Sequence, residues 1–377
     1  ISKDRATMDP APPAPAEHRF PCHTCGADMR FAPGSGQLIC DHCGATEEIT
    51  PPQTRAVIRE QDFQQALRAQ LPAAETEEIR TVTCENCGAR IEFDDKTHAS
   101  ECPFCATPIV TDTGAQRQIK PRALVPFALT EPQARERMTE WLGSLWFAPN
   151  GLQEYARKGR AMQGIYIPYW TYDADTRSNY SGARGDIYYV TQRVQVQRNG
   201  KMVTETRQVP KTRWTPTSGR VARFFDDVLV LGSRSLPKTY TDALAPWDLS
   251  ELAPYDPQFL AGFRAESYTV TLDEGYAEAR SYMDRMILRD VKFDIGGDKQ
   301  RVTRVDTAVS DVTFKHILLP VWMAAYKYRG NTYRFVVNGQ TGTVRGERPY
   351  SKVKIAIAVI IGLIIAAVAG AYFAANG

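Results

Sequence analysis

The sequence predicts an α+β fold in three parts: two N-terminal four-cysteine zinc ribbons, a β-rich α+β body and one C-terminal transmembrane helix. Three observations carry this prediction. All eight cysteines fall into two copies of one spacing, aromatic-rich alternating segments begin at about residue 118, and an uncharged apolar run lies near the C-terminus. The predicted parts, in chain order, are a disordered leader at 1–16, ribbon 1 at 17–50, a helical linker at 51–80, ribbon 2 at 81–110, the body at 118–350 and the membrane helix at 353–375.

The cysteine spacing predicts the metal sites. The first copy holds Cys22, Cys25, Cys40 and Cys43, and the second holds Cys84, Cys87, Cys102 and Cys105. Each Cys-x2-Cys pair forms a knuckle, and two knuckles supply the four thiolates that tetrahedral Zn2+ prefers. Because protein fills all four positions, the metal is structural rather than catalytic. We therefore expect two zinc ions per chain, each in a self-sufficient ribbon. Disulfide pairing is the alternative, which paired knuckles disfavour.

Histidines also occur in or beside the ribbons, but cysteines already fill every ligand position. We therefore expect these histidines to be solvated loop residues: His18, His23, His42 and His98.

The ribbon region is acidic. Residues 17–110 carry 8 Lys or Arg against 15 Asp or Glu, a net charge of −7, and each zinc centre with four ionised thiolates adds about −2. Phosphate affinity comes from Lys and Arg, so this charge makes nucleic acid an unfavourable partner. It favours a module that docks on a basic protein surface.

Helices are predicted where capping patterns precede apolar periodicity. Thr130 with Gln133 and Thr271 with Glu274 form such capping boxes in the body. Apolar residues from Phe63 onwards recur at helical spacing in the linker, where one short helix should pack on a ribbon or, alternatively, meet a partner.

The body contains a weak internal similarity. Residues 165–170 (IYIPYW) resemble residues 317–322 (ILLPVW), and both stretches follow a predicted helix. We infer an internal duplication with halves 118–235 and 236–350, although coincidence remains the alternative.

Hairpins are predicted at Asn199-Gly200 and Asn338-Gly339, each read as a two-residue type I′ turn. Around the first, residues 187–223 carry eight Lys or Arg against one Glu. This basic face could meet anionic lipid head groups, remain solvated, or pair with the acidic ribbons.

The C-terminal run, residues 355–375, has 21 residues without a charge, which matches a hydrocarbon core about 30 Å thick. Four basic residues precede it and none follow, which predicts a single-pass, tail-anchored protein of the inner (cytoplasmic) membrane with its soluble parts in the cytoplasm. Small residues at intervals of four would let a second helix approach and form a homo-oligomer: Gly362, Ala366 and Gly370.

No catalytic constellation is visible, so we expect the protein not to be an enzyme and to have no catalytic or cofactor-binding residues. His316 lies in an apolar strand, which favours a structural role. The adjacent carboxylates Asp226-Asp227 and Asp94-Asp95 are more typical of turns or solvated edges than of acid/base pairs.

Three segments, IYIPYWTYDADTRSNYSGARGD, LAPWDLSELAPYDPQFLAGFRAESY and RFVVNGQTGTVRGERPYSKVKI, together with the ribbons and the terminal span, resemble a bacterial family of zinc-ribbon membrane proteins. Its members are often labelled transcription-factor-type or primosomal-helicase-like, although no helicase motif is present here. Some are encoded beside SPFH (flotillin-like) and phage-shock-protein-A-like proteins, and are thought to recruit them to the membrane during envelope stress.

We therefore expect a membrane-anchored adaptor or scaffold that works by protein–protein interaction, with the lipid bilayer and these two kinds of protein as partners. Two alternatives remain open. One is a membrane-tethered nucleic-acid-binding protein, and the other is a regulatory subunit of a membrane enzyme complex.

Overall fold

The structure, a computed structural model, describes residues 20–49, 58–68, 71–72, 75–86, 88–92, 99–102, 104, 107–110, 114–149, 162–198, 201–328 and 331–376. Several sequence predictions fall outside these residues, namely the disordered leader at 1–16, His18, Asp94-Asp95, His98 and the turn residues Asn199-Gly200. Cys87 and Cys105 of the second ribbon also lie outside them.

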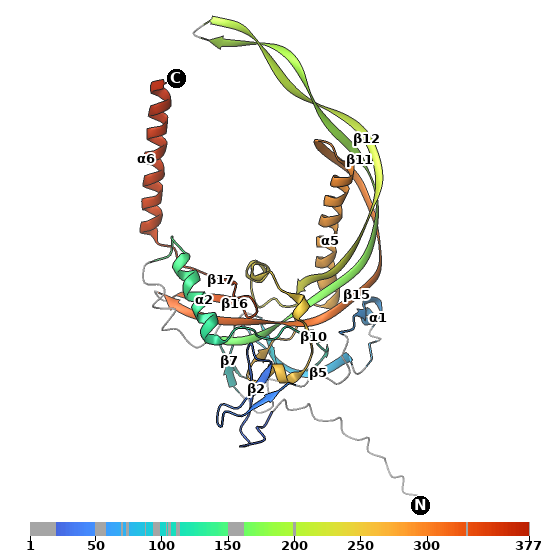
Figure 1. The fold of residues 1–377 in the computed structure, drawn as a ribbon, viewed down its shortest axis with the longest axis vertical. Helices are drawn as coiled ribbons and strands as arrows, with labels where there is room; N and C mark the ends of the chain where they lie inside the picture. Colours follow the sequence, from blue (N-terminus) through green and yellow to red (C-terminus); the bar gives the residue numbers. More distant parts are fainter. Residues whose placement is uncertain are drawn as a thin grey trace, which may run out of the picture.

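A nine-stranded sheet forms the body. Its path runs β12 (Lys201–Leu231), β11 (Gln163–Arg198), β15 (Lys299–Tyr328), β10 (Ala123–Leu124) and β13 (Ala253–Pro254). Shorter strands extend it: β14 (Arg264–Ala265) on β11, β16 (Asn331–Asn338) and β4 (Gln61–Asp62) on β15, and β17 (Val344–Gly346) on β16. Figure 1 shows β11, β12 and β15 curving together away from the ribbons. The β-rich α+β body of the sequence prediction is confirmed.

The three long strands differ in length. β11 pairs with β12 out to Arg198 opposite Lys201, whereas its pairing with β15 ends at Gly185 opposite Lys299. The hairpin beyond that point, residues 186–213, therefore continues as two strands, and we call it the arm.

Helix α5 (Leu272–Ile295) lies along the concave side of these strands (Figure 1). Its buried stripe includes Ala279, Met283 and Ile287, which pack with Trp170 and Phe314 of the sheet. The spacing of three and four residues along the buried stripe is that of one helix face.

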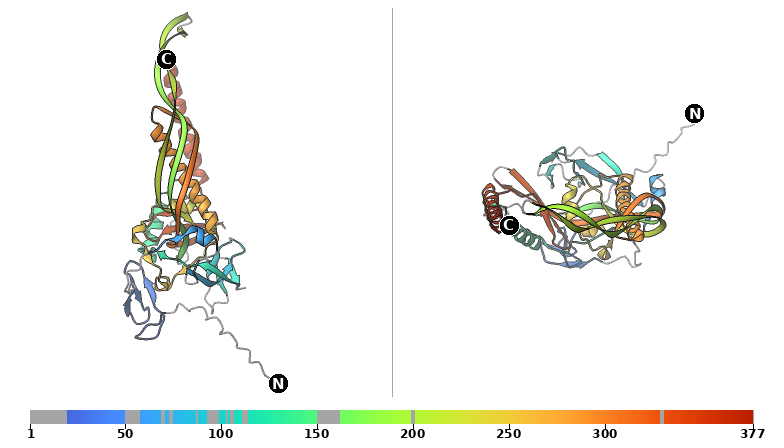
Figure 2. Two further views of the ribbon diagram at one scale, coloured as in Figure 1. Left: turned by 90° about the vertical axis from the view of Figure 1, so that its right-hand side faces the viewer. Right: turned by 90° about the horizontal axis from the view of Figure 1, so that it is seen from above.

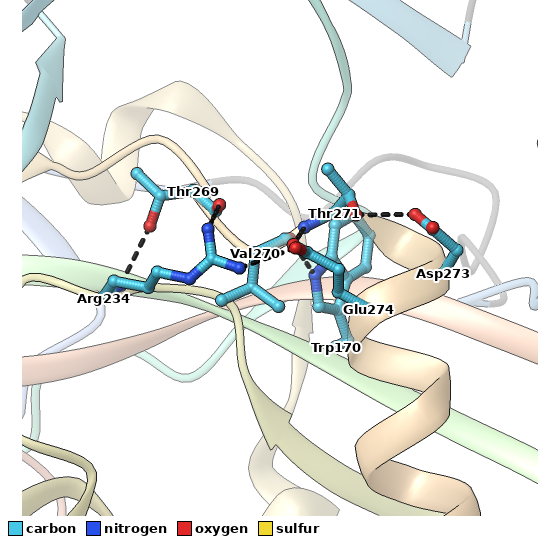
Figure 3. A network of polar contacts seen from close by, with 7 residues as sticks. All are labelled: Trp170, Arg234, Thr269, Val270, Thr271, Asp273 and Glu274. Atoms are coloured by element: carbon cyan, nitrogen blue, oxygen red, sulfur yellow. Dashed lines mark hydrogen bonds and ion pairs between the residues drawn. The ribbon is translucent and has the colours of Figure 1, made fainter.

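The start of α5 is tied to the sheet by the contacts drawn in Figure 3. The Glu274 side chain accepts from the backbone N–H of Thr271, which confirms the predicted capping box. Arg234 reaches Glu274 at 2.7 Å, and the Trp170 indole donates to the carbonyl of Val270 at 3.0 Å. These bonds fix the end of α5 that lies nearest the ribbons.

Helix α2 (Glu131–Ser144) begins at the other predicted capping box, where the N–H of Thr130 donates to Gln133 Oε1 at 2.8 Å. Ala134, Met138 and Leu142 are buried on its inner face. They share a hydrophobic core with Phe31 and Leu38 of ribbon 1.

The linker helix, α1 (Phe63–Leu67), is shorter than expected and packs elsewhere than on a ribbon. Phe63 is buried against Tyr172 of β11 and Tyr276 of α5, at ring distances of 6.3 and 4.4 Å. The preceding β4 pairs with β15. The aromatic side chain is thus used to fill the core of the body, and the predicted packing on a ribbon is wrong.

Two features of the body bear on the hairpin and duplication predictions. At Asn338-Gly339 the hairpin is longer than two residues, since the N–H of Asn338 donates to the carbonyl of Thr343. The buried Asn338 side chain accepts from the backbone N–H groups of Gln340 and Thr341, and Gly342 provides the left-handed residue at φ 78°. Residues 165–170 and 317–322 lie side by side as antiparallel neighbours, with Ile167 opposite Leu319. The duplication itself stays a prediction.

Helix α6 (Lys352–Asn376) stands away from the body in Figures 1 and 2. Its stretch Lys352–Phe373 has a mean hydropathy of 2.7, and none of it is buried. By length and composition this helix could cross a membrane.

Candidate metal centre and the ribbon–body contact

Ribbon 1 is built from three short antiparallel strands, β1 (Arg30–Ala32), β2 (Gln37–Ile39) and β3 (Thr46–Glu48). Its two knuckles have the same backbone pattern. The N–H of Cys22 donates to the carbonyl of Ala27, and that of Cys40 donates to Ala45, both at 2.8 Å. Gly26 turns the first knuckle at φ 74°, a conformation that disfavours a side chain. The local sequence therefore determines the backbone geometry of each cysteine pair.

The four sulfur atoms of ribbon 1 converge on one point. Their Sγ atoms all lie within 4.8 Å of one another, and the Cys22–Cys43 and Cys25–Cys40 pairs are each 3.5 Å apart. A tetrahedral ion bound through Zn–S bonds of about 2.3 Å needs sulfurs at this kind of spacing. These distances are those of four ligands around one ion rather than of a disulfide, whose sulfurs lie about 2.05 Å apart.

The neighbouring sulfurs also shift one another's ionisation. Backbone N–H groups of Cys25 and Thr24 lower the pKa of Cys22 to about 6. The Ala45 amide favours the Cys43 thiolate, but the Cys25 and Cys22 side chains outweigh it and raise the pKa of Cys43 to about 12. The four thiols therefore cannot all ionise while they face only one another. A divalent cation would remove this repulsion, so the residues fit zinc.

The second cysteine set shows the same backbone pattern in its described residues. The N–H of Cys84 donates to Ala89 and that of Cys102 to Thr107, both at 2.8 Å. Gly88 takes φ 72°, as Gly26 does in ribbon 1. The surrounding strands are β5 (Thr76–Thr83), β6 (Arg90–Glu92), β7 (Ala99–Glu101), β8 (Pro108–Val110) and β9 (Gly114–Ile119). Because Cys87 and Cys105 lie outside the described residues, a second zinc site stays a prediction.

Histidine does not complete the site in ribbon 1. His23 and His42 are exposed, and His23 lies 3.4 Å from the carboxylate of Glu47. Both therefore occupy loop positions, as the sequence suggested.

Ribbon 1 and the segment predicted to form ribbon 2 are both packed into the body. Phe31 of β1 meets Phe259 and Phe263 at ring distances of 5.3 and 6.3 Å, and its N–H donates to the carbonyl of Ala261. In a second core, Val82, Cys84 and Ile91 of ribbon 2 pack with residues of β11 and β15 such as Ile165 and Ile317. The ribbons thus contribute to two cores of the body. Nothing in the cysteine spacing could have indicated this.

A second group of charges lies in the three-stranded part of the sheet formed by β11, β12 and β15, and the sequence did not reveal it. Lys315 Nζ is buried 2.8 Å from Asp227, 3.0 Å from Glu60 and 3.5 Å from Asp173. Asp227 has φ 50°. Next to Asp173 the register of β11 shifts both against β12 and against β15. Asp173, Asp226 and Asp227 are close enough to surround an ion, but the ammonium of Lys315 already provides the positive charge there.

Burial raises the pKa of Asp173 to about 6, although the backbone N–H of Asp227 favours its charged form. The predicted turn or solvated edge at Asp226-Asp227 therefore describes exposed Asp226 but not Asp227, which pairs with Lys315.

His316 is buried beside this network. Its Nδ1 lies 2.8 Å from the carbonyl of Ile119, and Trp170 and Tyr268 pack on the ring. Burial lowers the pKa of His316 to about 4, so it is neutral at physiological pH. This is the structural role expected from the sequence.

Comparison with known proteins agrees with this geometry. Residues 16–48 match the family described as the zinc-finger of RNA-polymerase I-specific TFIIB, Rrn7. The chain is also similar to the uncharacterized protein YdjG of Bacillus subtilis (strain 168), with 26% identity over 342 residues that cover 89% of this chain and 92% of that protein. No solved structure matches the chain. The N-terminal segment is therefore a four-cysteine zinc ribbon on a mixed α/β body, in a chain similar over most of its length to a bacterial protein.

Proposed function

We propose that this protein is a membrane-anchored zinc-ribbon adaptor that holds partner proteins at the cytoplasmic face of the inner membrane. The observation that carries the proposal is the position of ribbon 1. One of its faces is fixed to a body that continues into the apolar helix α6, while its opposite edge is exposed and acidic. A rigid surface that is held by a zinc site on a membrane-tethered body is suited to binding a partner protein rather than to catalysis.

The residues next to the N-terminal end of α6 are evidence in favour of a membrane anchor. Trp146, Phe147 and Tyr350 are exposed to 64%, 36% and 58%, and the carbonyl of Phe147 accepts the N–H of Ser351 just before α6. Arg348 lies over the ring of Tyr350, 5.3 Å from its centroid. Exposed aromatic and basic residues next to an apolar helix are typical of a membrane interface.

We expect the body to lie on the cytoplasmic side, because the basic residues precede α6. Protease added to intact spheroplasts should leave the body uncut, whereas protease added to inside-out vesicles should degrade it. A chain truncated before Lys352 should appear in the soluble fraction. Degradation of the body in intact spheroplasts would contradict this orientation.

We also propose that ribbon 2 binds a second structural zinc ion. Its support is the repeated knuckle pattern at Cys84 and Cys102, both of which are buried. Metal analysis that finds one zinc per full-length chain would contradict it.

The proposed docking surface is the outer edge of ribbon 1. Strand β3 lies at the end of its sheet, and Thr46, Glu47 and Glu48 are all exposed. An edge strand offers backbone groups to an added strand, and its carboxylates would steer a basic or amphipathic partner. Surfaces of SPFH (flotillin-like) and phage-shock-protein-A-like proteins, as the family resemblance implies, are the partners we propose in an envelope-stress response.

Charge reversal at this edge is expected to weaken the contact. In the variant E47K/E48K, recovery of the phage-shock-protein-A-like or SPFH partner with the full-length protein should fall at least tenfold, because like charges would face each other. The matched control is E136K/E140K on the exposed face of α2, which makes the same charge change and should leave recovery unaltered.

Deletion of residues 17–110 would be a poor test, since it would remove Phe31 and Ile91 from the cores of the body. Undiminished recovery with E47K/E48K would move the docking site to another surface.

One alternative has an observation in its favour. The family matched by residues 16–48 carries a transcription-factor description, which fits a membrane-tethered nucleic-acid-binding protein. Tight, sequence-selective DNA binding by the full-length protein at physiological salt would favour that function. A regulatory subunit of a membrane enzyme would instead be revealed by activity in the co-purified complex.

A further inference from the structure

The arm, residues 186–213, lacks a third strand in the part of the chain that the structure describes. Pairing of β11 with β15 stops at Gly185, and β12 lies at the end of the sheet path. A two-stranded hairpin is at best marginally stable alone in water. The arm is therefore expected to be stabilised by contact with another surface.

One face of the arm combines apolar and basic residues. Residues directly opposite in an antiparallel pair share a face, and alternate pairs repeat on it. Three successive pairs on this face are Tyr188 with Lys211, Val190 with Val209, and Gln192 with Arg207. The valine pair thus lies between two pairs that each carry a cation. The same face also carries both acidic residues of the arm, Asp186 opposite Arg213 and Glu205 opposite Val194. Cations next to apolar groups are the arrangement of an element that lies in a membrane interface.

The charge of the arm is suited to an anionic surface. Residues 186–213 contain six Lys or Arg against two acidic residues, Asp186 and Glu205. Arg193, Arg207 and Lys211 are exposed, and none of the three forms an ion pair within the described residues. Tyr189 and Met202 are exposed to 65% and 63%, and with Arg193 they lie on the opposite face of the arm from Arg207 and Lys211. Both faces therefore present a cation and exposed apolar side chains, which suits contact with lipid head groups.

The arm also lies on the side of the body from which α6 leaves. In Figures 1 and 2 it extends in the same direction as α6 and curves towards its C-terminal end. The open edges of a two-stranded ribbon cannot enter hydrocarbon, where their backbone groups would have no partners. A membrane contact of the arm therefore requires that it lies in the head-group layer and not alongside the inserted part of α6.

We infer that the arm is a second membrane contact, which binds anionic lipid head groups of the leaflet that α6 enters. This inference rests on the membrane anchor of the proposed function. Nucleic acid is less suited to this face, because the valine pair interrupts the row of cations that a phosphate backbone would require.

The test uses the full-length protein reconstituted into vesicles and limited trypsin cleavage after Arg193. Only chains with the body outside the vesicle are scored. Cleavage should be at least tenfold slower in vesicles that contain phosphatidylglycerol than in vesicles of phosphatidylcholine alone. In R207Q/K211Q this protection should be lost, because each cation near an anionic surface contributes about fivefold to binding, whereas R59Q/R68Q, with the same charge change at exposed positions away from the arm, should retain it.

Equal cleavage in both kinds of vesicle would overturn the inference. So would protection that appears only at high protein density, which would indicate a second copy, or protection in phosphatidylcholine vesicles on addition of duplex DNA. Flotation of the same vesicles separates the two proposals. A chain that does not float refutes the membrane anchor, whereas a floating chain with an unprotected arm refutes only the lipid contact.

Discussion

Replacing Cys22 by Ser is expected to unfold ribbon 1 and to destabilise the body together with it. The free energy of zinc binding in such sites is about 10–16 kcal/mol in isolated peptides, which equals or exceeds the whole stability of a typical domain. Ribbon 1 also supplies Phe31 and Leu38 to the core that holds Tyr166 and Trp322. Withdrawal of each large side chain from such a core costs about 2–5 kcal/mol.

The measurement is zinc content and thermal unfolding of the detergent-solubilised, full-length protein. In C22S the zinc content should fall from two ions per chain to one, and the main unfolding transition of the body should shift down. His23→Ser is the matched control, because His23 is the neighbouring residue, its side chain is 85% exposed and it is not a ligand. Its effect should stay within about 0.5 kcal/mol.

The same experiment distinguishes two views of the ribbons. The repeated cysteine spacing suggests that each ribbon is a self-sufficient unit, and in that case C22S would leave the transition of the body unchanged. The contacts of Phe31 with Phe259 and Phe263 indicate that it will not. An unchanged transition in a variant that has lost one zinc would show that these contacts contribute little.

Features that depend on a few neighbouring residues could be predicted from the sequence. The knuckles at Cys22 and Cys40 and the capping boxes at Thr130 and Thr271 are local hydrogen-bonding patterns, and all four are present in the structure. The apolar stripe of α5 was equally readable, because helix periodicity is set within single turns.

Features set by distant contacts could not be predicted. Pro210 and Gly185 would ordinarily end a strand, yet β12 and β11 run through them because each has a long partner to pair with. Phe63 was expected on a ribbon and instead fills a gap between Tyr172 and Tyr276, more than a hundred residues away in sequence. Asn338 has the sequence of a tight turn, but its buried side chain donates to the carbonyl of Leu244 and the turn is longer.

The charge cluster around Lys315 is the clearest case of such long-range organisation. Lys315 is an ordinary strand residue in the sequence, and its partners Glu60, Asp173 and Asp227 come from three separate segments. Only the fold brings them together. The strongest test of their importance is to remove the single cation.

Lys315→Met is expected to destabilise the body by about 3 kcal/mol at neutral pH. Removing one partner of a buried ion pair costs about 3–5 kcal/mol. We expect a value at the lower end because Asp227 and Glu60 are partly exposed, so water screens their charges. Lys299→Met, on an exposed position of the same strand, is the control and should change stability by less than about 0.5 kcal/mol. Denaturant unfolding of the full-length protein in detergent would measure both.

The loss in Lys315→Met should depend on pH, and Asp173 determines the sign. Its pKa is raised to about 6 by burial, so the folded state holds the proton more tightly than the unfolded chain, whose carboxyl titrates near 3.9. In the native protein the stability from this group is present below pH 4 and is lost as the pH rises to about 6. Without Lys315 the ionised carboxylate of Asp173 is less stable in the folded protein. The fall in folding stability with rising pH therefore extends to higher pH. The variant should therefore be less destabilised at pH 5 than at pH 8, and equal destabilisation at both would show that Asp173 does not carry the charge that Lys315 balances.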